Sequence, residues 1–150
     1  MNNHQRIGAI SNSHVGSSFE QVAERYFLNN HFQISAKHSV TLGFQSTKVH
    51  YFDFGGKDSN GHDVIIECKS HKWTSGDNVP SAKLTVWNEA MLYFSLAPRD
   101  SRKILFVLKD YSIKRRETIA EYYKRVHGHL IPQQVEILEL DPISNAVRLI

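Results

Sequence analysis

The dipeptide Asn60-Gly61 constrains the fold of this chain more than any other feature of its 150 residues. Asn-Gly is the strongest short-range signal for a β-hairpin, because both residues tolerate the positive φ angles of a tight turn. The segments on either side, residues 48–54 and 64–69, are rich in β-branched and aromatic side chains, which favour strands. The sequence therefore predicts a β-hairpin over residues 48–69.

The second strand of this hairpin ends in an unusual way. The apolar run at residues 64–66 leads directly into Glu67 and Lys69. Burying a charge is costly unless the charge is paired or binds a metal. Because side chains alternate along a strand, Glu67 and Lys69 share one face, about 7 Å apart. This charged pair therefore needs a structural or chemical reason.

The length of the turn decides whether a second carboxylate joins the pair. A two-residue turn would place Asp53 on the face opposite to Glu67. A three-residue loop over residues 59–61, with Gly61 in the left-handed conformation, pairs Asp53 with Glu67 instead. We favour the three-residue loop, which brings Asp53, Glu67 and Lys69 to one surface of the sheet.

Two carboxylates and an amine on one surface suit metal-assisted phosphodiester chemistry. Magnesium takes oxygen ligands and is typically held by one or two carboxylates, with waters and phosphate oxygens in the other positions. A metal so held can polarise a phosphodiester and acidify a water, which a nearby lysine can orient. The alternative is a solvated hairpin edge with a cross-strand ion pair, which contributes under about 1 kcal/mol.

The pattern resembles the PD-(D/E)xK phosphodiesterase superfamily, the restriction-endonuclease-like nucleases. There an acid on one strand is followed by a hairpin turn and by apolar residues that lead into (Asp/Glu)-x-Lys; the matching residues here are Asp53, Glu67 and Lys69. The resemblance implies that Asp53 and Glu67 bind Mg²⁺, with Mn²⁺ able to substitute, and that the backbone carbonyl of Cys68 joins them. It also implies that Lys69 serves the attacking water.

The first predicted helix adds to this resemblance. Family members often place a further glutamate on that helix at the edge of the active site, and Glu20 occupies the equivalent place. Glu24, one turn later on the same face, competes for the role, and a capping box with Ser17 is the structural alternative for Glu20. The short chain looks most like Holliday-junction resolvases and small stand-alone nucleases.

The resemblance implies a divalent-metal-dependent endonuclease that cleaves DNA, and a homodimer would supply the two sites that two-strand cutting needs. A catalytically inactive nuclease-fold module that binds nucleic acid or a protein partner is the alternative. We expect a flexible arm over residues 1–16 and a single nuclease-like domain over residues 17–150.

Hydrophobic periodicity predicts an α/β fold: a mixed β-sheet flanked by helices. The expected order is that of a restriction-endonuclease-like core, namely helix, three strands, helix and strand, followed by a further helix and strand. The expected helices cover residues 19–28, 81–96 and 115–126. The expected strands cover residues 32–38, 48–54, 64–69, 103–109 and 134–140, with a short last strand at 147–150.

Composition argues against several other classes of protein. With a single cysteine, the chain has neither an internal disulfide framework nor a cysteine-based zinc cluster. No apolar run approaches the roughly 20 residues that span a bilayer, and the polar first residues do not predict a secretory signal. We therefore expect a cytoplasmic protein with no membrane partner. The net charge of +3 permits a polyanionic partner without requiring one.

Candidate DNA contacts lie outside the three-residue motif. The loop after it carries Lys72 and Trp73, which suit phosphate contacts and base stacking; an ordinary surface loop with a half-buried Trp73 is the alternative. The expected third helix carries several cations, among them Lys114, Arg115 and Arg116. They form either a patch for the DNA backbone or a solvated helix face.

Two further sets of polar residues come from other predicted elements. On the second predicted helix, Asn88 or Glu89 could support the metal site, although an ordinary exposed face explains both residues. The histidines His127 and His129 are close in sequence, but no carboxylate lies at a spacing typical of metalloproteases, so we expect no histidine metal site there.

Overall fold

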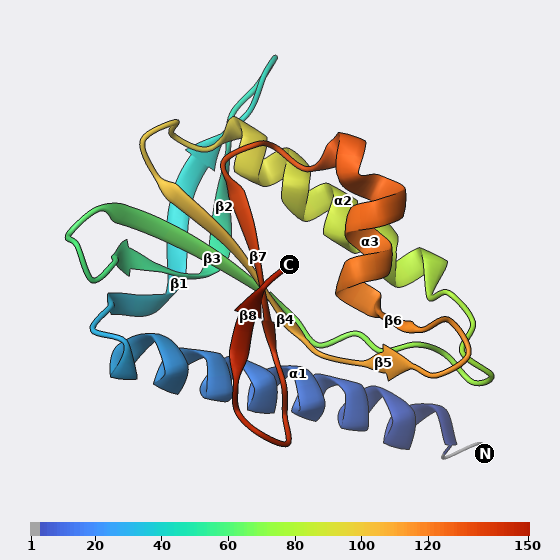
Figure 1. Ribbon diagram of the computed structural model, residues 1–150. Coiled ribbons are helices and arrows are strands. Elements are labelled where there is room, and N and C mark those ends of the chain that lie inside the picture. The colour runs from blue at the N-terminus through green and yellow to red at the C-terminus, as the bar shows by residue number, and fades with distance from the viewer. Residues whose placement is uncertain (1–3) are drawn as a thin grey trace.

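The structure is a computed structural model that describes the backbone of residues 4–150 and the side chains from residue 16 onward, except that of Ser17. Its helices are α1 (His4–Asn29), α2 (Ser81–Leu96), α3 (Ile119–His127) and the short 3-10 helix η1 (Gly128–Leu130) (Figure 1). Its strands are β1 (Gln33–Leu42), β2 (Lys48–Lys57), β3 (Asp63–Lys69), β4 (Arg102–Leu108), β5 (Tyr111–Ser112), β6 (Glu117–Thr118), β7 (Val135–Leu140) and β8 (Val147–Leu149).

The main sheet has six strands in the order β1-β2-β3-β4-β7-β8. The three central strands β3, β4 and β7 are parallel, and the other neighbouring pairs are antiparallel. The strands β5 and β6 form a separate small hairpin. This confirms the predicted α/β class with a mixed sheet flanked by helices.

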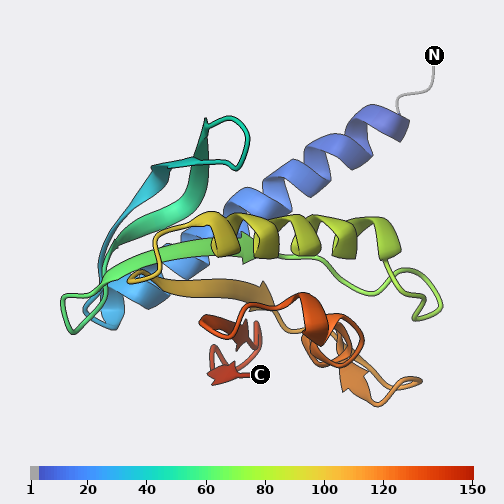
Figure 2. The ribbon, with the colours of Figure 1, turned by 90° about the horizontal axis from the view of Figure 1, so that it is seen from above.

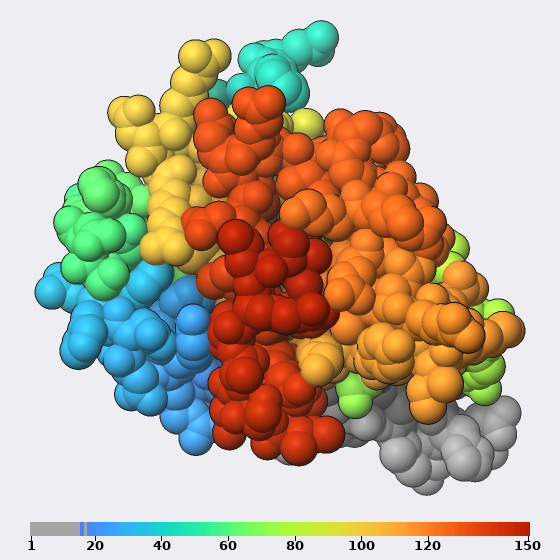
Figure 3. All heavy atoms as spheres, viewed as in Figure 1, coloured from blue at the N-terminus to red at the C-terminus, as the bar shows by residue number. Residues whose placement is uncertain are grey.

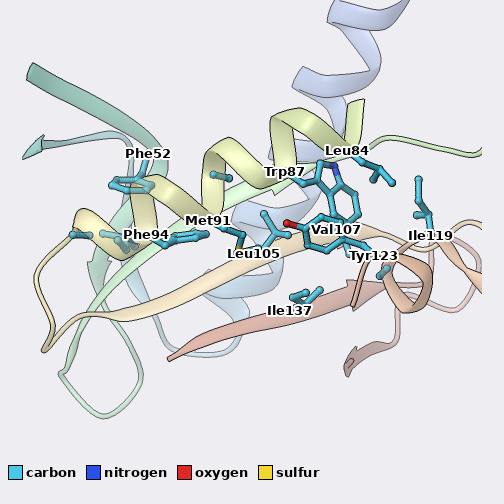
Figure 4. Packing of buried hydrophobic residues seen from close by; sticks show 14 of the residues in the cluster. Phe52, Leu84, Trp87, Met91, Phe94, Leu105, Val107, Ile119, Tyr123 and Ile137 are labelled. Carbon is cyan, nitrogen blue, oxygen red and sulfur yellow. The ribbon is translucent and has the colours of Figure 1, made fainter. Parts of the chain in front are cut away.

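Helices cover both faces of this sheet. Figure 1 shows α1 on one side and α2 with α3 on the other. The core on the α1 side includes Phe19 and Phe27, and the core on the other side includes Trp87 and Tyr123 (Figure 4). Each core is one layer of side chains between the sheet and its helices, which is the arrangement expected when both faces of a sheet are apolar.

The strand β4 is the centre of both cores. Ile104 and Phe106 pack on the α1 side, whereas Leu105 and Val107 pack on the side of α2 and α3, and all four are fully buried. A parallel strand with helices on both faces is apolar along its whole length. This explains why the run at residues 103–108 is almost entirely apolar in sequence and confirms the buried strand predicted there.

The start of α1 differs from the prediction. The helix already begins at His4, so Ser17 and Ser18 lie within it and do not cap its first turn. The flexible arm expected over residues 1–16 is therefore helical from His4 on, and residues 1–3 lie outside the described residues. The Asn, Ser and Gly residues that suggested a loop lower helix stability by at most about 1 kcal/mol each, which a helix can tolerate.

The start of α3 also differs from the prediction. Residues 111–118 form the hairpin of β5 and β6, and α3 begins at Ile119. Thr118 and Glu121 form a capping box, in which the Glu121 N–H donates to Thr118 Oγ1 at 3.2 Å and the Thr118 N–H donates to Glu121 Oε2 at 2.7 Å. Arg116, at a φ of 59°, is not helical. The cations at positions 114–116 are therefore in the hairpin and not on the helix.

The C-terminal segment lies next to α3, as the face in Figure 3 shows. Arg148 of β8 contacts Glu121 of α3 at 2.9 Å and the fully buried Glu139 of β7 at 2.7 Å. The last strand is thus held to the sheet by a charge pair as well as by its backbone. Within residues 4–150, no helix is both long enough and apolar enough to cross a bilayer.

Candidate active site

The hairpin of β2 and β3 has the register that the three-residue loop predicts. Phe54 pairs with Ile66, and Gly61 in the loop has a φ of 82°. The pairing ends at Phe54 and Ile66, the residues directly adjacent in sequence to Asp53 and Glu67. The choice of register made from the turn sequence is therefore confirmed.

The strand β2 bends at Asp53. The pairing with β3 stops at Phe54, and the carboxylate of Asp53 accepts a hydrogen bond of 2.7 Å from the backbone N–H of Cys68. Phe52 packs in the core under α2, whereas Phe54 packs in the core under α1, although two residues apart on a regular strand share a face. Opposite this bend, Lys37 of β1 has a left-handed φ of 55°. Figure 2 shows the β1–β2 hairpin projecting away from the rest of the sheet.

Glu67 and Lys69 contact each other at the end of β3. Lys69 Nζ lies 2.8 Å from Glu67 Oε1, and the two side chains are only 13% and 14% exposed. The other oxygen, Glu67 Oε2, is buried and has no hydrogen-bond partner in the described part of the chain. Because a buried carboxylate oxygen without a partner is costly, this position favours a bound cation or hydrogen-bond donor.

Asp53 lies close enough to Glu67 to be affected by its charge. Burial and the charge of Glu67 raise the pKa of Asp53 to about 6, and the Cys68 N–H and the charge of Lys69 oppose the rise. Two carboxylates in a partly buried site disfavour each other's ionised form. The structure thus brings Asp53, Glu67 and Lys69 to one surface, as the sequence predicted.

Glu20 on α1 lies at the edge of the same site. Burial and the charge of Asp53 raise the pKa of Glu20, whereas the charge of Lys69 lowers it. The competing residue Glu24 lies one helical turn further along α1. The electrostatic contact with Asp53 and Lys69 favours Glu20 as the glutamate of the first helix.

The residues present fit a magnesium ion that keeps several waters. Asp53 and Glu67 supply two carboxylates, and the backbone carbonyl of Cys68 lies between Glu67 and Lys69 in sequence. The thiol of Cys68 packs in the α1-side core, and burial raises its pKa, so it is not a ligand. Among the described residues, no group of three or more His, Cys, Asp or Glu side chains forms a ready-made metal cluster. Magnesium does not require one.

His50 is a residue of this site that sequence analysis missed. Its ring stacks on Tyr93 with 3.8 Å between centroids, and its Nε2 is buried without a partner in the described chain. Burial lowers the pKa of His50, and the charges of Glu89, Lys69 and Asp53 also act on it. Regular alternation does not predict this position, because the bend at Asp53 lies between His50 and the motif.

The two candidates on α2 have different surroundings. Asn88 Oδ1 accepts a hydrogen bond of 3.0 Å from the Tyr123 hydroxyl, which ties α2 to α3. Glu89 is exposed and acts on His50 through its charge. Of the two, Glu89 is the one whose charge acts on a residue of the candidate site.

The proposal that Trp73 stacks on bases is wrong. Its side chain is only 9% exposed, and its Nε1–H donates to the backbone oxygen of Asp110 at 3.0 Å. The backbone N–H of Trp73 also donates to Asp110 Oδ2 at 2.7 Å. These contacts bury the indole against α3, where it meets Tyr122 edge-on. No face of the ring is left for a base.

Arg115 is also engaged within the protein. Its Nε–H donates to the backbone oxygen of Asp77 at 2.7 Å, and its guanidinium lies 5.1 Å from the centre of the Trp73 ring. Lys114 and Arg116 are exposed in the β5–β6 hairpin, and Lys72 is exposed next to the motif. These three lysine and arginine residues remain candidate phosphate contacts.

No family model matches this chain, and no curated protein is similar enough to count as a relative. The likeness to the PD-(D/E)xK superfamily therefore depends on the residues and on their arrangement in space.

Proposed function

We propose that the protein is a divalent-metal-dependent nuclease that hydrolyses DNA phosphodiester bonds, acting as an endonuclease. One observation carries this proposal: Asp53 and Glu67 lie side by side next to Lys69, and one oxygen of Glu67 is buried without a partner in the described chain. Two carboxylates so placed repel each other unless a proton or a cation lies between them. A divalent cation would satisfy both.

The order of elements supports a restriction-endonuclease-like core. Helix α1, strands β1 to β3, helix α2 and strand β4 follow one another in the chain, and the proposed site lies where β2 separates from β3. In such an open α/β sheet, the ends of neighbouring strands are a common place for a ligand site. A homodimer, with one site in each copy, would allow both DNA strands to be cut.

In this proposal Asp53, Glu67 and the carbonyl of Cys68 hold Mg²⁺ or Mn²⁺. A bound divalent ion polarises the phosphodiester and lowers the pKa of a nearby water. The Asp53 carboxylate is already positioned for this, because the Cys68 N–H orients one of its oxygens. The second oxygen is left for the ion.

Lys69 and Glu20 have supporting roles. The ammonium of Lys69, which contacts Glu67 at 2.8 Å, can donate a hydrogen bond to the attacking water or to a phosphate oxygen and offset negative charge there. Glu20 lies near both Asp53 and Lys69 and can accept a hydrogen bond from a water at the outer edge of the site.

One observation favours a second candidate, a nuclease-fold module that binds nucleic acid without cleaving it. The Lys69 ammonium contacts one Glu67 oxygen, so the lysine itself offsets part of the charge that a metal would neutralise. In that case the site would be a structural ion pair. Divalent metal would then neither stabilise the protein nor support cleavage of DNA.

The test compares plasmid, branched and single-stranded DNA in Mg²⁺ or Mn²⁺. We expect cleavage by the wild type and a loss of about 10²-fold or more in Asp53→Asn and Lys69→Ala. The matched control is Asp63→Asn, because Asp63 is an exposed carboxylate on the same strand as Glu67. If DNA binds and no divalent metal supports cleavage, the nuclease proposal is wrong and the protein is a module that binds nucleic acid.

A further inference from the structure

A pocket of about 530 Å³ lies beside the candidate active site, where the loop after β3 meets the first turn of α2. It is lined by Lys69 and Ser70, by His71 and Lys72 of the loop, and by Lys83 of α2. None of the described residues that line it is acidic. A concave surface with only basic charged groups attracts anions.

The imidazole of His71 is held in one tautomer. The fully buried Trp87 donates from its Nε1–H to His71 Nδ1 at 2.8 Å, so Nδ1 accepts and the proton of the neutral ring is on Nε2. Burial and the charges of Lys69 and Lys83 lower the pKa of His71 to about 4. At neutral pH, His71 is therefore an uncharged ring with a single N–H donor at Nε2.

The helix α2 begins at this pocket. Pro80, the residue before its first turn, makes no side-chain capping bond. The N–H groups of Ser81 and Lys83 in this turn donate to the backbone oxygens of Val79 and Pro80, so it is the helix dipole that adds positive potential at this end of the helix. The pocket thus combines the positive charges of its lysines, the positive end of a helix and a neutral N–H donor.

We propose that this pocket binds an internal phosphodiester group of the DNA strand, next to the phosphodiester held at Asp53 and Glu67. Lys72 and Lys83 supply charge, and His71 Nε2–H donates a hydrogen bond to a phosphate oxygen. The pocket thereby sets the position of the strand relative to the site. This inference rests on the proposed nuclease function and assigns a substrate subsite to residues outside the three-residue motif.

The first test measures binding of duplex DNA with hydroxyl groups at all its ends, so that only internal phosphodiesters are available. Chelation of divalent metals keeps the DNA intact, and fluorescence anisotropy gives the affinity at several salt concentrations. The affinity for duplex DNA falls as the salt concentration rises, and removing one phosphate contact decreases the steepness of log affinity against log salt by about 0.9. We expect this decrease in Lys83→Gln. Arg99→Gln removes an exposed charge just beyond the other end of α2 and should leave the slope unchanged.

The second test separates a phosphate contact of His71 from a structural role. In His71→Asn, the side-chain oxygen can replace Nδ1 as the acceptor for Trp87, but the donor at Nε2 is lost. In His71→Gln, a donor near the Nε2 position is kept, and the acceptor for Trp87 is lost. A phosphate contact predicts about tenfold weaker DNA binding in His71→Asn at unchanged thermal stability. A merely structural role predicts wild-type binding in His71→Asn and lower stability in His71→Gln.

The third test uses inorganic phosphate and does not depend on catalysis. Amide NMR signals of Ser70 and His71 should shift as phosphate is added to the metal-free wild type, and the shifts should be smaller in Lys83→Gln. If phosphate shifts no signal of this loop, or if Lys83→Gln and Arg99→Gln change the salt slope equally, the phosphate subsite is wrong even when the protein cleaves DNA. If the pocket binds phosphate and no metal supports cleavage, the subsite stands and the nuclease proposal fails.

Discussion

Replacing Asp53 by asparagine should make the metal-free protein more stable at neutral pH. The pKa of Asp53 is about 6 in the folded protein, compared with 3.8 for an ordinary aspartate, because burial and Glu67 disfavour its ionised form. Asparagine has the same shape, and its side-chain oxygen can still accept the hydrogen bond from the Cys68 N–H. The change therefore removes the repulsion and keeps the contact.

The size of the effect follows from this pKa difference. One pKa unit corresponds to about 1.4 kcal/mol, so ionising Asp53 in the folded state costs up to about 3 kcal/mol in the free energy of unfolding. Because the folded state binds this proton more tightly than the unfolded chain does, the cost is absent below about pH 4. It grows as the pH rises to about 6 and is constant above that. Remaining solvent contact reduces the expected gain at pH 7 to about 2 kcal/mol.

Urea unfolding of wild type and Asp53→Asn from pH 4 to pH 8, in a chelator, measures this difference. The two proteins should be nearly equal in stability at pH 4 and should diverge as the pH rises, with the variant more stable. Asp63→Asn, at an exposed site, is the matched control and should show no such divergence. A difference that does not depend on pH, or a less stable variant at pH 7, would refute the raised pKa of Asp53 that burial and the charge of Glu67 cause.

The same experiment with Mg²⁺ tests the proposed metal site without any measurement of activity. A ligand that binds only the folded state raises the free energy of unfolding as its concentration increases. Mg²⁺ should therefore stabilise the wild type at pH 7, which lies above the Asp53 pKa of about 6, and should have little effect on Asp53→Asn. Equal stabilisation of both proteins would show that Mg²⁺ binds at a site that does not include Asp53.

Changes at three further positions test other parts of the structure. Arg148→Ala leaves the fully buried Glu139 without its ion-pair partner. Urea unfolding should show a free energy of unfolding lower by about 3 kcal/mol. A loss below about 1 kcal/mol would contradict the burial of that charge. Gly61→Ala should lower the free energy of unfolding by about 1 to 2 kcal/mol, because Gly61 has a φ of 82° and no atom crowds the position. Gly61→Asn should lower it less, because asparagine adopts this left-handed conformation more readily. Trp73→Phe removes the hydrogen bond to Asp110 and should lower the free energy of unfolding, measured by thermal unfolding, by about 1 kcal/mol. The affinity for DNA should stay unchanged. A large loss of affinity would support a role of Trp73 in base stacking.

Local sequence determined the parts of the fold that depend on neighbouring residues. The turn at Asn60-Gly61 limited the hairpin to two registers, and the structure has the favoured one, with a three-residue loop and a left-handed φ at Gly61. The apolar periodicity also predicted α2 over residues 81–96 and the buried strand β4. Each of these signals is contained in fewer than about twenty consecutive residues, over which propensity and periodicity act directly.

Tertiary structure decided the surroundings of the site. The bend of β2 at Asp53 turns His50 toward the site, and strand alternation cannot predict a bend. The Asp110 contacts that bury Trp73 join residues 37 apart in the chain, and the Trp87 bond that orients His71 joins residues 16 apart. Side chains so distant in sequence meet only after the sheet and helices have packed. The sequence by itself therefore determined which carboxylates and which amine share a surface, and only the packed fold decided which histidines and aromatic rings surround them.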